Sequence, residues 1–103
     1  MIIREKDRMS LHNYFETITM PVEIWAYGSR VNGLAHEGSD LDLVIRTKDL
    51  QPFPISEYTK LVEQIRESNI PILVEIRDWT RLPESFHQQI EKQHEVFYSS
   101  INH

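Results

Sequence analysis

Apolar residues along the first part of the chain recur at the spacing of a helix. Leu11, Phe15 and Ile18 follow one another at intervals of three and four residues, which is typical of a single buried helix face. This pattern predicts a helix over residues 7–19. The residues expected to cap and end it are Asp7 or Ser10 and then Pro21. Further helices are predicted over residues 29–34, over residues 56–68, and from Pro83 through Phe97.

Short apolar runs between these helices predict strands. The runs cover residues 22–27, 39–47 and 72–76, and each is bounded by glycine, proline or polar residues. Helices and strands therefore alternate along the chain. This order predicts an α/β (α+β) fold, in which a small mixed sheet is flanked by helices. We expect residues 1–103 to form one domain.

Composition and charge exclude several classes of function. The chain has 103 residues, of which 40% are hydrophobic, and its net charge is −5. Proteins that grip extended nucleic acid are usually basic, so we expect no such partner. No apolar stretch approaches the roughly 20 residues of a membrane span, and the charged N-terminus does not resemble a signal peptide. With no cysteine present, the sequence is compatible with a cytoplasmic location.

All three glycines of the protein lie in one segment, which begins where the first predicted strand ends. Gly28 permits a tight bend there without a side-chain clash, and Ser29 begins the short helix that follows. Backbone N–H groups in such a bend, next to a helix start, form a cradle for phosphate. Ser29 could instead be only a helix cap, although one geometry serves both roles.

Two aspartates open the second predicted strand and suggest a metal site. Asp40 and Asp42 are two residues apart, so their side chains point to the same side of a strand. Two carboxylates on one side repel each other unless a cation lies between them. Mg²⁺ typically takes one or two carboxylates together with substrate phosphates. The alternative is a solvated junction between loop and strand. Combined with the phosphate cradle, the pattern favours a metal–nucleotide site.

A third carboxylate would complete the site. Glu75 is the acid inside the third predicted strand, and its alternative role is that of a sheet-edge acid facing water. Asp78 competes for the position. It lies three residues further on, which would place it on the opposite side of the strand, and there it would cap or turn the chain before Trp79.

Other polar residues give weaker signals. Arg30 is expected to contact phosphate or a partner, or else to form a surface salt bridge. His36 lies between the two halves of the motif, where a solvated role is expected. His87 and His94 are seven residues apart on a predicted helix, but two histidines do not make a zinc site. Trp25, Tyr27 and Trp79 are expected to lie in the core.

The spacing of these residues resembles that of a known family. Gly28-Ser29, the ten residues 30–39, and Asp40-x-Asp42 match the signature of the DNA polymerase beta superfamily of nucleotidyltransferases. The version in this chain resembles the minimal nucleotidyltransferase (MNT) branch. The resemblance implies Mg²⁺ as cofactor and ATP as nucleotide substrate. It assigns Asp40, Asp42 and Glu75 to metal binding and catalysis, and Gly28, Ser29 and Arg30 to nucleotide binding.

The resemblance also implies a partner. MNT proteins usually accompany a HEPN-domain protein, and resemble the antitoxin half of a pair. The expected reaction transfers AMP from Mg-ATP to a hydroxyl, a tyrosine of the HEPN ribonuclease toxin, which this modification silences. The chain is short for a sizeable acceptor-binding domain of its own, so we expect the acceptor on a partner. The alternative is a non-catalytic nucleotide-binding module that neutralises or scaffolds its HEPN partner by contact. A third possibility is a homodimeric nucleotidyltransferase that acts on small molecules.

Overall fold

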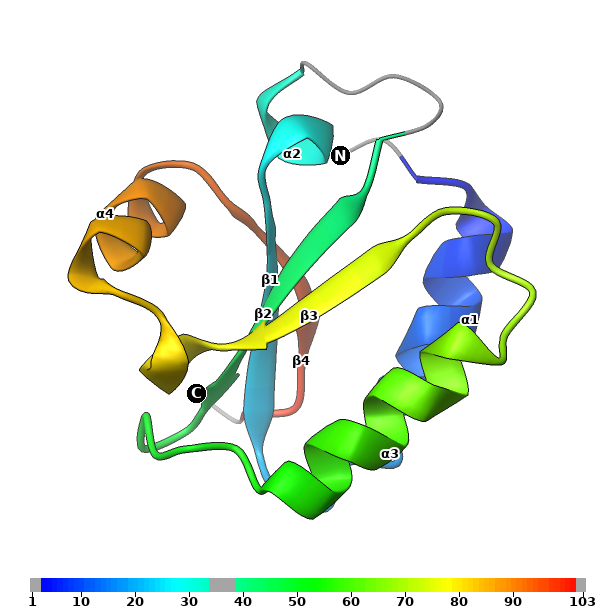
Figure 1. The fold of residues 1–103 in the computed structure, drawn as a ribbon, viewed down its shortest axis with the longest axis horizontal. Coiled ribbons are helices and arrows are strands. Elements are labelled where there is room, and N and C mark those ends of the chain that lie inside the picture. The colour runs from blue at the N-terminus through cyan, green and yellow to red at the C-terminus, as the bar shows by residue number, and fades with distance from the viewer. Residues whose placement is uncertain (1–2, 34–38, 102–103) are drawn as a thin grey trace.

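A four-stranded mixed sheet forms the centre of the protein, with strand order β3-β2-β1-β4 (Figure 1). The computed structural model describes residues 3–33 and 39–101. β1 pairs antiparallel with β2 and with β4, whereas β2 and β3 are parallel and are connected through α3. The elements are α1 (Glu5–Phe15), β1 (Val22–Tyr27), α2 (Ser29–Asn32), β2 (Leu41–Thr47), α3 (Ile55–Arg66), β3 (Val74–Asp78), the 3-10 turn η1 (Trp79–Arg81), α4 (Glu84–Lys92) and β4 (Glu95–Ser99).

One face of the sheet carries the main core. Figure 1 shows α1 and α3 covering this face, and α4 lying on the other side of the sheet. Alternate residues of the strands point toward α1 and α3 because side chains of a strand alternate between its two faces. The buried residues of this core include Ile24, Ala26, Leu41, Leu43, Ile45 and Ile76 from the strands and Leu11, Phe15, Leu61 and Ile65 from the helices.

A smaller apolar cluster lies on the opposite face, under α4. It consists of Trp25, Val44, Trp79 and Ile90. The guanidinium of Arg46 lies 3.9 Å from the ring centroid of Trp25 and 4.5 Å from that of Trp79. Cation–π contacts of this kind stabilise the packing of charged groups against aromatic rings. The expectation that both tryptophans belong to the core is confirmed. Their cluster lies on the same face of the sheet as the polar residues described below.

The first helix is shorter than the apolar spacing predicted. α1 begins at Glu5 and ends at Phe15, and its N-cap is Arg4. The capping roles expected for Asp7 and Ser10 are therefore wrong. Asp7 lies in the first turn and forms an ion pair with Arg4, with 3.0 Å between Nε and Oδ2. The helix ends early because the hydroxyl of Thr17 donates to the Tyr14 carbonyl at 2.7 Å, which favours a turn.

The C-terminal part differs most from the prediction. The last helix, α4, ends at Lys92, and residues 95–99 form the strand β4 where a helix through Phe97 was expected. Ser100 secures the end of this strand, since its N–H donates to the Val22 carbonyl at 2.9 Å. The third strand is also displaced, because β3 covers Val74–Asp78 instead of residues 72–76. Among the described residues, no helix combines the length and apolarity needed to cross a bilayer.

Candidate functional site

Three polar side chains lie in one row across the sheet. Tyr27 of β1 is the register partner of Asp42 of β2, and Asp42 is the register partner of Glu75 of β3. Side chains of register partners point to the same side of a sheet. Asp42 and Glu75 therefore face the same side, as the metal-site hypothesis requires. This side is the one on which α4 lies, at the end of β1 where α2 begins.

The bend after β1 brings the backbone against one of these carboxylates. Gly28 has φ +81°, and a Cβ placed there would lie 2.6 Å from Oδ2 of Asp42. Its carbonyl accepts hydrogen bonds from the N–H groups of Val31 and Asn32, both at 3.0 Å, so Gly28 is the N-cap of α2. The cap role considered for Ser29 is thus filled by Gly28. The Ser29 hydroxyl makes no hydrogen bond within the described part of the chain and remains available to a ligand.

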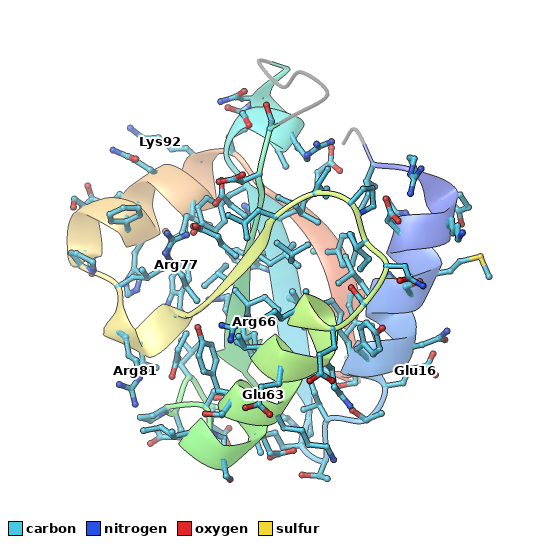
Figure 2. All side chains as sticks on the ribbon, turned by 45° about the vertical axis from the view of Figure 1, so that its right-hand side comes forward. Glu16, Glu63, Arg66, Arg77, Arg81 and Lys92 are labelled. Carbon is cyan, nitrogen blue, oxygen red and sulfur yellow. The ribbon has the colours of Figure 1, made fainter. Side chains whose placement is uncertain are left out.

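An arginine that the sequence analysis missed links the members of the row. Arg77 lies two residues after Glu75 in β3 and faces the same side. Its Nη2 is 2.7 Å from Glu75 Oε2, and its Nη1 is 3.5 Å from Asp42 Oδ1. Nη1 also donates to the hydroxyl of Tyr27 at 3.0 Å. Figure 2 shows Arg77 extending from β3 on the side of α4. Its spacing of two from Glu75 was a signal that could have identified it.

The electrostatics of the row reflect partial burial of like charges. Burial raises the pKa of Asp42 above its ordinary value of 3.8, and the nearby charges of Glu75 and Asp40 raise this pKa further. The guanidinium of Arg77 opposes these effects. Burial also raises the pKa of the Tyr27 hydroxyl, while its hydrogen bond from Arg77 lowers it. The row therefore holds excess negative charge that one arginine only partly compensates.

The donor set of the row fits a hard divalent cation. Asp42 and Glu75 contact a single cationic group, the guanidinium of Arg77, so a positive charge is already accommodated between them. Asp40 is exposed just before β2, and its charge acts on Asp42. No group of three or more acidic, histidine or cysteine side chains in the described residues is arranged to hold a metal as it stands. A cation that bound between Asp42 and Glu75 would have to displace the guanidinium of Arg77.

Asp78, the competing third carboxylate, has a structural role. Its Oδ2 accepts a hydrogen bond from the backbone N–H of Phe53 at 2.9 Å, and its Oδ1 accepts from the N–H of Thr80 at 3.0 Å. The side chain is buried and caps η1. The expectation that this residue turns the chain before Trp79 is confirmed. Asp78 is three residues from Glu75, so the two side chains leave β3 on opposite sides.

Arg30 connects the two halves of the sequence motif. It is buried, and its Nε and Nη2 donate to the carbonyl of Ser39 at 3.0 and 2.7 Å. This contact ties α2 to the residue that precedes Asp40. A structural role is therefore evident, and contact of Arg30 with phosphate stays a prediction. His36 and Gly38 lie outside the described residues.

The two histidines of the C-terminal region pack against the tryptophans. His87 stacks on Trp79 with 3.9 Å between ring centroids, and its Nε2 lies 2.6 Å from the Trp79 carbonyl oxygen. His94 stacks on Trp25 at 3.8 Å, and its Nδ1 lies 2.9 Å from the Ile90 carbonyl oxygen. Both histidines thus hold α4 and its C-terminal end against the sheet. His94 lies beyond the end of α4, so the prediction that the two histidines share one helix is wrong.

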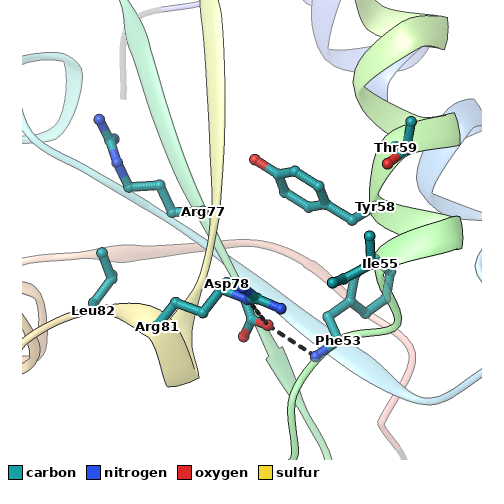
Figure 3. A pocket seen from close by; sticks show the side chains of 8 residues that line it. All are labelled: Phe53, Ile55, Tyr58, Thr59, Arg77, Asp78, Arg81 and Leu82. Carbon is teal, nitrogen blue, oxygen red and sulfur yellow. Dashed lines mark hydrogen bonds and ion pairs between the residues drawn. The ribbon is translucent and has the colours of Figure 1, made fainter.

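Two pockets flank the row of polar side chains. One of about 330 Å³ lies between the bend and α4, and is lined by Tyr27, Gly28, Asn32, Phe86, Gln89, Ile90, Lys92 and Gln93. The other, of about 470 Å³, lies at the β3 edge and is lined by Phe53, Ile55, Tyr58, Thr59, Arg77, Asp78, Arg81 and Leu82. Figure 3 shows Arg77 and Tyr58 on either side of the β3 ribbon in this second pocket. The two pockets adjoin the row from different directions, through Gly28 and through Arg77.

Comparison with known proteins identifies the family. The family model described as polymerase beta, nucleotidyltransferase matches residues 10–102. A probable protein adenylyltransferase MntA of Haemophilus influenzae is 31% identical over 90 residues, which cover 87% of this chain and 77% of that protein. The family model spans nearly all of the described fold, including the bend, the aspartates and β4.

Solved structures share the fold. A crystal structure of a toxin–antitoxin with AMP-PNP has a TM-score of 0.70 and 18% identity, covering 95% of this chain and 75% of that one. A mutant of the toxin–antitoxin MntA-HpeT has a TM-score of 0.69 and 16% identity, with the same coverage of 95% and 75%. The chain therefore belongs to the polymerase beta superfamily of nucleotidyltransferases, in its minimal nucleotidyltransferase branch.

Proposed function

We propose that this protein transfers AMP from Mg-ATP to a hydroxyl of a partner protein, a tyrosine of a HEPN-type toxin, and so acts as the antitoxin of the pair. The single observation that carries the proposal is the row of Asp42 and Glu75 on one side of the sheet, with the Gly28 backbone against Asp42. The names of the similar proteins, a protein adenylyltransferase and toxin–antitoxin complexes, support the substrate and the partner. We propose that the reaction takes place in the cytoplasm, because it consumes ATP.

Different residues of this chain would carry out different parts of the reaction. The attacking hydroxyl oxygen forms a bond to the α-phosphorus, the bond from that phosphorus to the bridging oxygen breaks, and pyrophosphate leaves. Ser29 and the backbone of the bend hold the terminal phosphates, because N–H groups at a helix start attract anions. Glu75 accepts the proton of the attacking hydroxyl. Asp40, Asp42 and Glu75 would hold Mg²⁺, which would supply positive charge to neutralise the phosphate oxygens.

The two pockets offer separate places for the two substrates. The pocket beside Gly28 contains Phe86 and amide side chains, which suit the nucleoside of a nucleotide whose phosphates lie at the bend. The pocket beside Arg77 is open at the β3 edge and contains apolar side chains together with Arg81. It would receive the side chain of the acceptor. Because the pockets approach the row from different directions, both substrates can be bound at once.

The second candidate is a non-catalytic module that binds nucleotide and neutralises its HEPN partner by contact. The observation that favours it is the pairing of Arg77 with both carboxylates, which gives the row a stable arrangement without a metal. In this case Asp42, Glu75 and Arg77 would act as a structural ion-pair network of the kind that also perturbs pKa values away from active sites.

Labelled ATP distinguishes the two functions. The purified protein is incubated with its HEPN partner, Mg²⁺ and ATP labelled in the α-phosphate. We expect label on the partner with the natural protein and a loss of at least about a hundredfold with Asp40→Asn. Asp49→Asn is the matched control, because Asp49 is exposed in the turn after β2. A tight complex that forms equally with Asp40→Asn, with no label on the partner in any reaction, would instead establish the module.

A further inference from the structure

Arg77 takes the position that a metal ion would need. Its guanidinium lies 2.7 Å from Glu75 and 3.5 Å from Asp42, and it also donates to Tyr27. These are the contacts of a counter-ion, made by a side chain that is 40% exposed and not locked in the core. An isolated pair of partly buried carboxylates would repel each other. Arg77 partly compensates this repulsion in the protein without ligand.

We propose that Arg77 is an exchangeable internal counter-ion, which makes the site select a metal–nucleotide complex over a free metal ion. A free divalent ion binds the carboxylates only if the guanidinium gives them up and keeps only the Tyr27 hydroxyl and water as partners. A metal that arrives with a nucleotide brings phosphate oxygens, which accept the hydrogen bonds of the released guanidinium in bidentate geometry. This inference rests on the proposed function, because it assumes that Asp42 and Glu75 bind the metal.

The surroundings of Arg77 allow such an exchange. The side chain also lines the pocket of about 470 Å³ at the β3 edge, so space lies next to it (Figure 3). Long, partly exposed arginine side chains change rotamer on the picosecond to nanosecond scale, which is fast compared with a catalytic cycle. Movement of Arg77 therefore requires no rearrangement of the sheet.

Binding of Mn²⁺ without nucleotide tests the inference. Mn²⁺ is titrated into the natural protein, Arg77→Gln and Arg81→Gln, and the free ion is followed by electron paramagnetic resonance. Arg81 is the matched control, since it lines the same pocket, and its Nε lies 3.6 Å from Asp78 and outside the row. Loss of Arg77 should tighten Mn²⁺ binding about tenfold, because one competing charged hydrogen bond is removed. Arg81→Gln should bind Mn²⁺ like the natural protein.

The same titration in the presence of ATP gives the opposite expectation. Arg77→Gln should bind Mn-ATP severalfold more weakly than the natural protein, because the guanidinium no longer contacts phosphate. Equal Mn²⁺ affinities of the two arginine variants would overturn the inference while leaving the proposed function intact. If the natural protein binds no Mn²⁺ even with ATP, the proposed metal site itself is wrong, and the inference falls with it.

A measurement on the natural protein removes any dependence on how the variants fold. The nuclear magnetic resonance signal of the Arg77 Nε–H group is assigned and followed during titration. We expect it to move when Mg-ATP is added and to stay in place with the same concentration of MgCl₂ alone. A signal that is unchanged at saturating Mg-ATP would show that Arg77 keeps its carboxylate partners, which contradicts the exchange.

Discussion

Gly28 and Gly33 both have a positive φ, but they differ in ψ, which is −155° at Gly28 and 4° at Gly33, and in their surroundings. Their φ angles are +81° and +85°, in the left-handed region where side chains other than glycine's are strained. A Cβ at Gly28 would collide with Asp42, whereas a Cβ at Gly33 would meet nothing within 4 Å. The pair therefore separates the cost of backbone strain from the cost of displacing a carboxylate.

This difference predicts distinct results for two alanine variants. Gly33→Ala should lower the free energy of unfolding by about 1 kcal/mol through backbone strain, and Gly28→Ala should lower it by more, because its Cβ also collides with Asp42. Only Gly28→Ala should also abolish the binding of Mg-ATP, because Asp42 must shift. Denaturant unfolding and calorimetric titration measure the two effects. Equal loss of Mg-ATP binding in both variants would show that the contact with Asp42 is unimportant.

Ionisation of the Asp42 carboxyl destabilises the folded protein, so its effect on the free energy of unfolding depends on pH. Its pKa is raised from 3.8, first by burial, so the ionised form is disfavoured in the folded protein. Below the ordinary pKa the carboxyl is neutral in both states and the cost is absent. As the pH rises through the raised pKa, the folded state loses stability relative to the unfolded state. Near neutral pH this cost is fully developed.

Asp42→Asn should therefore stabilise the protein while abolishing transfer. We expect a gain of about 0.5–1 kcal/mol near neutral pH, which is typical when a strained active-site group is replaced. The gain should disappear below about pH 4, where the natural carboxyl is protonated in both states. Thermal unfolding across this pH range measures it. A variant less stable than the natural protein at neutral pH would show that the contact with Arg77 outweighs burial.

At the residue scale, sequence reasoning was sufficient where chemistry depends on local spacing. Asp40 and Asp42 were assigned to one side of a strand from its periodicity, whereas Glu75 was assigned to the site by the family resemblance. The register of β2 and β3 places Asp42 and Glu75 on the same side of the sheet. The contact of Arg77 with Asp42 was missed because it depends on how β2 and β3 are paired. Arg30 was expected to reach a phosphate, a partner or a surface salt bridge, and its contact with Ser39 depends on how the chain returns to β2.

β4 is the element that the sequence pattern did not predict, because its residues were assigned to the last helix. Phe97 continues an apolar spacing that begins in α4, yet its ring packs against Phe15 of α1, with 5.9 Å between centroids. A helix through this residue could not pair with β1. The antiparallel pairing with β1 covers an edge that would otherwise be open, and satisfies its backbone groups.

Two substitutions in β4 test its orientation. Phe97→Ala should lower the free energy of unfolding by about 3–5 kcal/mol, because Phe97 is 2% exposed in the core. Val96→Ala, at the adjacent and 54% exposed position, should cost less than about 1 kcal/mol. Denaturant unfolding compares them. Similar losses for the two variants would contradict the alternation of a strand.

The displacement of β3 by two residues has a similar origin. Ile72 and Leu73 are apolar and were assigned to the strand, but Leu73 is 59% exposed. Parallel pairing begins with Leu41 opposite Val74 and ends with Ile45 opposite Asp78. β3 thus begins opposite the first residue of β2 but ends at Asp78, before β2 ends at Thr47, and no local pattern in residues 72–78 reveals this pairing.

For the whole molecule, ligand binding and folding are coupled. A ligand that binds only the folded state stabilises it by about 2.7 kcal/mol at a hundred times its dissociation constant. In a domain of this size, 1 kcal/mol corresponds to roughly 4–8 °C in melting temperature. Mg-ATP should therefore raise the melting temperature by about 10 °C or more at that concentration.

Removal of the metal should reverse this stabilisation. Addition of EDTA in the presence of ATP should return the melting temperature nearly to that of the protein alone. Without a metal between them, the carboxylates of the row repel the phosphates of ATP. Scanning calorimetry with ATP, with Mg-ATP and with Mg-ATP plus EDTA provides the comparison. Equal stabilisation by ATP with and without metal would indicate that the carboxylate row takes no part in binding.

The sequence by itself predicted the class of the fold, which the structure confirms, and the roles of the site residues, which stay a prediction. The glycine bend and the paired aspartates follow from spacings of a few residues, where backbone geometry dictates which way side chains point, and the acid of the third strand follows from the family resemblance. Tertiary structure alone decided the existence of β4, the limits of β3 and the place of Arg77. All three depend on pairing between segments that lie far apart in the chain. The energy of this pairing is summed over the whole sheet, so no single segment shows it as a periodic pattern of residues.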